Sequence, residues 1–139
     1  MATPTPDTRP RGRGAVPSTA PAGRAELARR GEELACDVLA RAGLKVVDRN
    51  WRCGDGEIDI VARAPGLLVI CEVKTRRGHT HGSPAAAVTP TKRRRLRHLA
   101  AAYLAAHPVQ GSVCVRFDVV SVTWPRGQEP TLHHLAGVL

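Results

Sequence analysis

Hydrophobic residues recur at helical spacing in two segments of the chain. Between residues 24 and 42, apolar side chains follow one another at steps of three and four residues, and Gly43 supplies a stop after the pattern. A second apolar stripe, which includes Leu96 and Tyr103, runs through residues 90–106. The two patterns predict amphipathic helices, the second of which begins with a proline at its first position.

Extended patterns lie between and after these helices. Strands are predicted at residues 44–48, 57–62, 67–75, 113–122 and 131–135. The second and third form a β-hairpin around a turn at residues 63–66, and residues 49–56 are expected to form a loop. The apolar run Leu67–Cys71 lacks alternation, which is typical of a strand covered on both faces. The order α-β-β-β-α-β, with a last short strand, predicts an α/β fold in which helices cover a mixed sheet.

The beginning of the chain differs in composition from the rest. Residues 1–22 contain five prolines, two glycines and scattered arginines, and such a segment buries too little apolar surface to offset the entropy of ordering it. We therefore expect a disordered, basic, proline-rich tail followed by one domain at residues 23–139. The sequence has neither the apolar run of a signal peptide nor about 18 successive apolar residues for a membrane span. A cytoplasmic protein without membrane contact is expected.

The cysteine pattern favours a reduced protein. The four cysteines are widely spaced and form no CxxC pair, so the spacing of a zinc ribbon or finger is absent. Cys36, Cys71 and Cys114 stand in apolar segments, which predicts small core residues rather than disulfides.

Positive charge dominates the sequence and is concentrated in one place. The chain has 21 Lys+Arg against 12 Asp+Glu, for a formal net charge of +9, which favours a polyanionic partner such as nucleic acid, most simply DNA. The densest basic cluster, at the start of the second predicted helix, consists of Lys92, Arg93, Arg94, Arg95 and Arg97. Arg76 and Arg77, just after the third strand, are candidates to extend it. The alternative is a charge run that is merely solvated.

The predicted hairpin places acidic residues on one face. If it folds symmetrically about its turn, Asp59 faces Glu72 and Glu57 faces Lys74, and all four project to the side opposite Ile58, Ile60, Cys71 and Val73. Carboxylates directly opposite each other destabilise a hairpin, which a divalent cation would offset. Mg²⁺, with Mn²⁺ as an alternative, suits oxygen ligands, and Lys74 would stand beside its bound water. The alternative is a solvated face with an ordinary Glu57–Lys74 pair.

Helical geometry singles out two further residues. At roughly 100° per residue, Glu33 points away from the apolar stripe of the first helix, whereas Glu32 lies on the flank of that stripe. Glu32 can therefore reach the edge of whatever the helix covers, or it is an ordinary surface residue. Lys92 lies within roughly 40° of Leu96, on the inward side of the second helix. Its side chain either snorkels to solvent or reaches a phosphate or an active-site carboxylate.

These residues also carry a resemblance to known proteins. Asp59 followed by Glu72-Val73-Lys74 on the next strand resembles the D-(D/E)xK core of restriction-endonuclease-like nucleases, although Ile58 stands where a proline is frequent. A wider pattern over about residues 24–135 resembles the YraN family. It comprises Gly31-Glu32, Leu34-Ala35, Arg49-Asn50, residues 56–62, residues 72–76, Lys92 and residues 116–120.

The resemblance implies a fold and an activity. The fold would be the three-layer restriction-endonuclease-like one, similar to archaeal Holliday-junction resolvases, and the activity Mg²⁺-dependent hydrolysis of DNA phosphodiesters, including branched DNA. Asp59 and Glu72 would bind the metal with the Val73 carbonyl as a further ligand, Glu32 would support it, and Lys74 would act on the nucleophilic water. Two alternatives remain, a non-cutting nucleic-acid-binding module of the same fold and a regulatory interaction protein. A homodimer is compatible with each.

Overall fold

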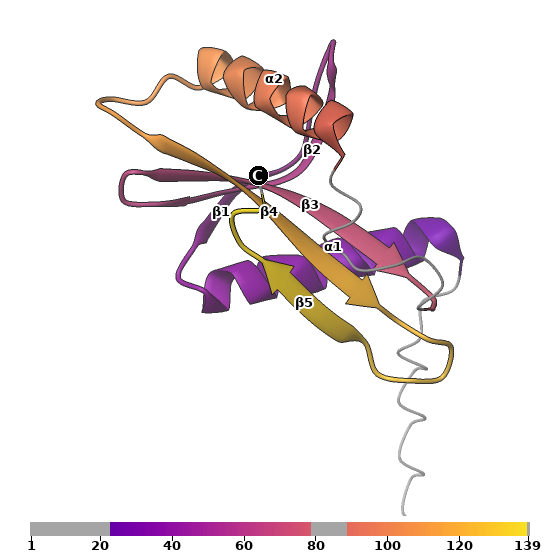
Figure 1. Cartoon of the computed structure of the whole chain (residues 1–139). Coiled ribbons are helices and arrows are strands. Elements are labelled where there is room, and N and C mark those ends of the chain that lie inside the picture. Colours follow the sequence, from indigo (N-terminus) through magenta and orange to yellow (C-terminus); the bar gives the residue numbers. More distant parts are fainter. Residues whose placement is uncertain (1–22, 79–88, 139) are drawn as a thin grey trace, which may run out of the picture.

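Two helices and five strands make up the part of the chain that the computed structural model describes, residues 23–78 and 89–138 (Figure 1). They are α1 (Arg24–Arg41), β1 (Lys45–Cys53), β2 (Gly56–Ala64), β3 (Leu67–Arg76), α2 (Pro90–Ala106), β4 (Cys114–Thr123) and β5 (Thr131–Leu135). The order is the predicted one, and the last short strand is confirmed. The predicted tail at residues 1–22 lies outside the described residues.

The strands form a single mixed sheet in the order β1-β2-β3-β4-β5. Neighbouring strands are antiparallel except for β3 and β4, which are parallel. A parallel pair needs a crossover connection rather than a tight turn, and α2 lies in the connection between β3 and β4. The predicted mixed sheet is therefore confirmed.

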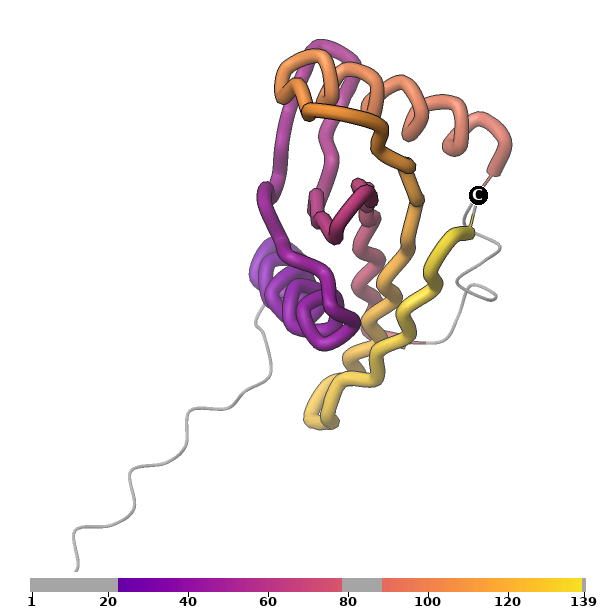
Figure 2. Tube along the Cα trace, turned by 90° about the vertical axis from the view of Figure 1, so that its left-hand side faces the viewer, coloured from indigo at the N-terminus to yellow at the C-terminus, as the bar shows by residue number. Residues whose placement is uncertain are grey.

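The two helices cover opposite faces of the sheet, so the domain has three layers (Figure 2). Val69 and Cys71 of β3 belong to the core cluster beneath α1, and Leu68 and Ile70 belong to the cluster beneath α2. Successive side chains of a strand point to opposite faces, so an unbroken apolar run is what a doubly covered strand requires. Within the described residues, neither helix has the length and apolar content needed to cross a membrane.

Helix α1 approaches β3 very closely at Gly31. A methyl group added at Gly31 would lie within 2.9 Å of Thr75 Cγ2 and would overlap Thr75 Oγ1. A glycine is needed here because any side chain would push the helix away from the strand. The contact sets the height of α1 above β3 and thereby the position of Glu32, the next residue along the helix.

Strand β1 is longer than its pattern predicts. It continues through residues 49–53, which were expected to lie in a loop, and only Gly54 and Asp55 separate it from β2. The segment pairs with β2, and the ring of Trp51 packs edge-on against Tyr103 of α2 with 5.2 Å between centroids. This contact with a distant helix is absent from any local pattern. The contact gives Trp51 a packing role.

All four cysteines are free, as predicted. Cys71 is buried, and Cys36 is half-buried against the cluster beneath α1. Cys114 is exposed, which contradicts its expected place in the core. The reason is its position as the first residue of β4, before that strand enters the region between the helices.

Candidate functional site

Strands β2 and β3 separate at Asp59. Their pairing runs from Ala64 opposite Leu67 to Ile60 opposite Cys71, which is the predicted register, and it ends there. Beyond this point β2 continues beside β1, and β3 continues beside β4. The prediction that Asp59 and Glu72 form a directly opposed pair of the hairpin is therefore wrong, because the ladder between β2 and β3 ends before it reaches them, while each strand keeps its other neighbour.

The separation is accompanied by a break in the alternation of β2. Residues two apart on a regular strand share a face, yet Ile58 packs in the cluster beneath α2 and Ile60 in the cluster beneath α1. On the neighbouring β1, Asn50 has a left-handed φ of 50°. The predicted grouping of Ile58 with Ile60, Cys71 and Val73 on one face is corrected accordingly: Ile58 lies on the other side.

A side chain bridges the two strands where their ladder ends. Asp59 Oδ2 accepts a hydrogen bond from the backbone N–H of Val73 at 2.9 Å. The carboxylate is thereby fixed beside the Glu72–Lys74 segment, and among the described residues Oδ1 has no hydrogen-bond partner. The sequence placed Asp59 next to Glu72 and Lys74, and the structure retains that proximity through this bond instead of through the ladder.

The surroundings of Asp59 disfavour its negative charge. Burial raises the pKa of Asp59 to about 6, opposed by the Val73 N–H and reinforced by the charges of Glu32, Glu72 and Glu57. Glu32 reaches this site from α1, on which it is half-buried, whereas Glu33 is exposed and pairs with Arg29 at 2.7 Å. Burial is thus the main reason that the charge of Asp59 is disfavoured, and the neighbouring carboxylates add to it.

Two lysines engage the second carboxylate. Lys92 Nζ lies 2.8 Å from Glu72 Oε1, and Lys74 Nζ lies 3.6 Å from the same oxygen. Lys92 therefore contacts a carboxylate, which is one of its two predicted alternatives. Its side chain is only 16% exposed, so it does not snorkel to solvent. Glu57 pairs instead with Arg52 at 3.4 Å, so the ordinary Glu57–Lys74 pair is not formed.

The acidic residues lie near one another without forming a closed ligand cluster. Within residues 23–78 and 89–138, no group of three Asp, Glu, His or Cys side chains is arranged to hold a metal ion. Asp59, Glu72 and Glu32 influence one another electrostatically, but Glu72 points to the lysines.

A small cavity and a wider groove lead to the acidic pair. The cavity, of about 40 Å³, is lined by Glu57, Asp59, Glu72 and Arg95 with neighbouring apolar atoms, and its size suits one or two waters or a single ion. The groove, of about 360 Å³, is lined by Glu72, Lys74, Thr89, Thr91, Lys92 and Arg95. Glu72 and Arg95 line both, so the groove connects the start of α2 with the carboxylates. Sequence reasoning placed Arg95 in a basic cluster but did not place it here.

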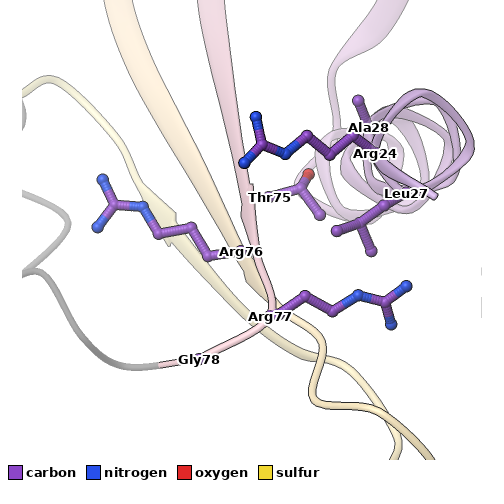
Figure 3. A pocket seen from close by; sticks show the side chains of 7 residues that line it. All are labelled: Arg24, Leu27, Ala28, Thr75, Arg76, Arg77 and Gly78. Carbon is purple, nitrogen blue, oxygen red and sulfur yellow. The ribbon is translucent and has the colours of Figure 1, made fainter.

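The basic residues form two groups. Arg93, Arg94, Arg95 and Arg97 are all exposed on the first turns of α2, where Thr89 Oγ1 accepts the Lys92 N–H at 3.2 Å and caps the helix. Arg76 and Arg77 line a different pocket with Arg24, at the start of α1 (Figure 3). The expected extension of the α2 cluster by Arg77 is not what the structure shows, because its side chain lies on the α1 side of β3.

Sequence reasoning gave no role to Asp118, the one charged residue that is fully buried among the described residues. Its carboxylate accepts hydrogen bonds from Arg116 at 2.9 and 2.8 Å, from the His134 ring at 2.8 Å and from the Gly137 N–H at 3.0 Å. Burial alone would raise the pKa of Asp118, but these bonds lower it overall. An aspartate inside an apolar strand pattern is the signal that could have found this network. It ties β5 and the segment after it to β4.

The raised pKa of Asp59 predicts a pH-dependent stability. The pKa of Asp59 is about 6 in the folded protein and about 4 in the unfolded chain. Its contribution to stability is therefore complete below about pH 4 and is lost as the pH rises through 6. Asp59→Asn keeps an oxygen for Val73 but does not titrate. Without divalent metal, wild type should lose up to about 3 kcal/mol relative to the variant between about pH 4 and pH 8. Urea unfolding across this range measures it, with exposed Asp37→Asn as the control. Parallel profiles for wild type and Asp59→Asn would contradict the assignment.

The fold and the site together define the class of protein. It is a three-layer α/β domain with an acidic pair and two lysines at the point where two strands of the sheet separate. The chain belongs to the family described as "Uncharacterised protein family UPF0102", whose model matches residues 31–122, as the resemblance to the YraN family predicted. It is similar to a UPF0102 protein of Kineococcus radiotolerans, with 53% identity over 78% of this chain and 88% of that one. Relatives of the same description in Mycolicibacterium smegmatis and Streptomyces griseus are 51% and 50% identical, each over 83% of this chain and over 94% and 97% of their own.

Proposed function

We propose that this protein is a metal-dependent endonuclease of the restriction-endonuclease-like fold, which hydrolyses phosphodiester bonds in DNA, with branched DNA among its substrates. The observation that carries the proposal is the separation of β2 and β3 at Asp59, which gathers Asp59, Glu72 and Lys74 around the end of a ladder. The three-layer arrangement, with a hairpin followed by a crossover helix and a parallel strand, is the arrangement that the family resemblance implies. Four free thiols fit the reducing cytoplasm in which such an enzyme would act.

The residues at this point suit a Mg²⁺ or Mn²⁺ ion. Asp59 and Glu72 would hold it with the Val73 carbonyl, and Glu32 would support its water shell. All are hard oxygen donors, and the burial and neighbouring carboxylates that raise the pKa of Asp59 disfavour its negative charge, which a bound cation would compensate. Such an ion supplies a water of lowered pKa and screens the charge of a phosphodiester.

Basic side chains of this protein would act on the water, orient Glu72 and bind the phosphates. Lys74, whose side chain is 38% exposed, lines the groove beside Glu72. It would orient the nucleophilic water there or accept a proton from it. Lys92 fixes the orientation of Glu72 through its 2.8 Å contact. Arg95 stands where the groove meets the acidic pair and would receive the phosphate, while Arg93, Arg94 and Arg97 would hold neighbouring phosphates.

A second candidate is a nucleic-acid-binding module of the same fold that does not cut. The observation that favours it is the engagement of Glu72 by two lysines together with the absence, in the described part of the chain, of three converging metal ligands. In such a module Lys74 and Lys92 would neutralise Glu72 permanently, and the basic residues of α2 alone would contact DNA.

A cleavage assay separates the two candidates. Purified protein is incubated with fluorescently labelled duplex, single-stranded, flap and four-way DNA, in Mg²⁺ or Mn²⁺ and in EDTA. The nuclease should cut at least one structure, only with metal, and with a preference that identifies the substrate. Binding without cleavage of any structure in either metal would replace the nuclease with the non-cutting module.

DNA affinity should depend steeply on salt. Each phosphate neutralised on duplex DNA contributes about −0.9 to the slope of log K against log salt. Arg93→Ala with Arg94→Ala should flatten this slope by up to about two units and weaken binding to all sequences similarly. Fluorescence anisotropy over a salt series measures it. The control is Arg63→Ala with Arg126→Ala, two exposed arginines outside α2. An equal effect of both pairs would show that only net charge matters.

A further inference from the structure

A second basic pocket lies on the opposite side of β3 from the groove. It has a volume of about 570 Å³ and is lined by Arg24, Leu27, Ala28, Thr75, Arg76, Arg77 and Gly78 (Figure 3). Thr75 faces α1, as its contact with Gly31 requires, whereas Glu72 and Lys74 face α2 and its Lys92. The pocket is therefore separate from the groove, although Thr75 directly follows Lys74 in the chain.

Its lining matches a phosphate group with an apolar neighbour. Arg24, Arg76 and Arg77 are among its lining residues, the side chain of Arg76 extends away from α1, and none of the described lining residues is acidic. Figure 3 shows Arg24 extending from α1 toward Thr75, and Arg77 extending from β3 on the α1 side. Each guanidinium carries five N–H donors in a planar fork, so it keeps donors for a phosphate even when it contacts another group. The Thr75 hydroxyl adds a further donor, and Leu27 with Ala28 provides an apolar floor.

The size and position of the pocket indicate which phosphate it takes. Its volume falls in the range of about 300–1,000 Å³ that is usual for ligand pockets. Thr75 lies three positions after Glu72 on β3, roughly 10 Å along the strand. A phosphate bound here is too far from Asp59 and Glu72 to be the one cleaved. A nucleic-acid strand extends over such distances, and its neighbouring phosphates repeat the same charge.

We infer that this pocket is a second phosphate site, which binds a non-scissile phosphate of the nucleic acid whose scissile phosphate enters the groove. The inference rests on the proposed function and adds to it a positioning contact on the α1 side of β3. Holding the substrate at two separate points fixes its orientation, which a single cluster on α2 cannot do. Arg24 and Arg77 are the positioning residues, and Thr75 assists them, whereas the side chain of Arg76 extends away from α1 (Figure 3).

Two exposed alanines of α1 provide a matched test. Ala28→Glu places a carboxylate in the pocket, and Ala40→Glu makes the same change in charge on the same helix away from it. Affinity for a DNA duplex is measured in EDTA over a salt series, so that no cleavage intervenes. Ala28→Glu should weaken binding about tenfold and lower the salt slope by about 0.9, the contribution of one phosphate. Ala40→Glu should change both values by less than half as much.

Amide NMR signals of the unmodified full-length protein give a test that does not depend on any variant. Duplex DNA should shift the signals of Thr75 and Gly78, and inorganic phosphate at the same phosphate concentration should shift them much less. Shifts with inorganic phosphate alone would overturn the inference in favour of a site for free phosphate. Shifts confined to α2, with equal affinities for the two glutamate variants, would overturn it and leave the proposed function intact. If the protein does not bind DNA even at low salt, both the inferred phosphate site and the proposed function are wrong.

Discussion

Replacing Lys74 with alanine should lower DNA cleavage by roughly 10²–10⁴-fold, the usual contribution of a general acid–base group. The side chain lines the groove 3.6 Å from Glu72 and belongs to neither core cluster, so the fold should survive the change. DNA affinity should fall by no more than the contribution of one phosphate contact. Initial cleavage rates, with circular dichroism and anisotropy on the same samples, measure the three quantities.

Two further variants make the Lys74 result specific. Lys74→Arg should not restore cleavage, because a guanidinium stays protonated and is wider than an ammonium group. Lys45→Ala, an exposed lysine at the start of β1, removes the same charge and should keep wild-type activity. Full activity in Lys74→Ala would exclude Lys74 from the chemistry. A cost of only about 0.2–1 kcal/mol in stability, with activity unchanged, is what a surface pair would give.

Replacing Asp118 with alanine should destabilise the domain by about 3 kcal/mol, at the lower end of the range for breaking a buried ion pair. The lower end applies because Arg116 is 33% exposed, so that water can solvate part of the guanidinium left behind. His134 and the Gly137 N–H also lose their acceptor, which should loosen β5 first. Urea unfolding gives the free energy, and hydrogen exchange in β5 locates the loss.

The control for Asp118 is an aspartate that makes no such contacts. Asp37→Ala, on the exposed side of α1, should change the free energy of unfolding by no more than about 0.5 kcal/mol. If Asp118→Ala were as stable as Asp37→Ala, the network at Asp118 would not be what holds β5 and the following segment to β4.

Local pattern was sufficient to predict the order of the elements and part of the site. Both helices have apolar residues at steps of three and four. The unbroken apolar run Leu67–Cys71 correctly predicts that β3 is covered on two faces. The hairpin register was predictable because the turn at residues 63–66 fixes it over the pairs next to the turn. The inward direction of Lys92 followed from its angle to Leu96 on the helix.

Features that depend on distant segments were not predictable from local pattern. The separation at Asp59 involves four strands, because β2 stays paired with β1 and β3 stays paired with β4 beyond the point where the hairpin ladder ends. The extended part of β1 pairs with β2 and also carries Trp51, which contacts Tyr103, 52 positions further along the printed sequence. Arg24 and Arg77 line one pocket, beside the place where Gly31 lets α1 approach β3. The contact of Trp51 with Tyr103 and the approach of Gly31 to Thr75 each join residues that lie far apart in the sequence.

Isothermal titration calorimetry with Mn²⁺ tests most directly whether the acidic pair is a metal-dependent centre. Wild type, Asp59→Asn and the control Asp37→Asn are titrated at neutral pH, alone and with a non-cleavable DNA duplex. We expect wild type and Asp37→Asn to bind the ion, and Asp59→Asn to bind it at least about tenfold more weakly, since it loses one charged ligand. No binding by wild type at millimolar metal, with or without DNA, or equal binding by Asp59→Asn, would contradict it.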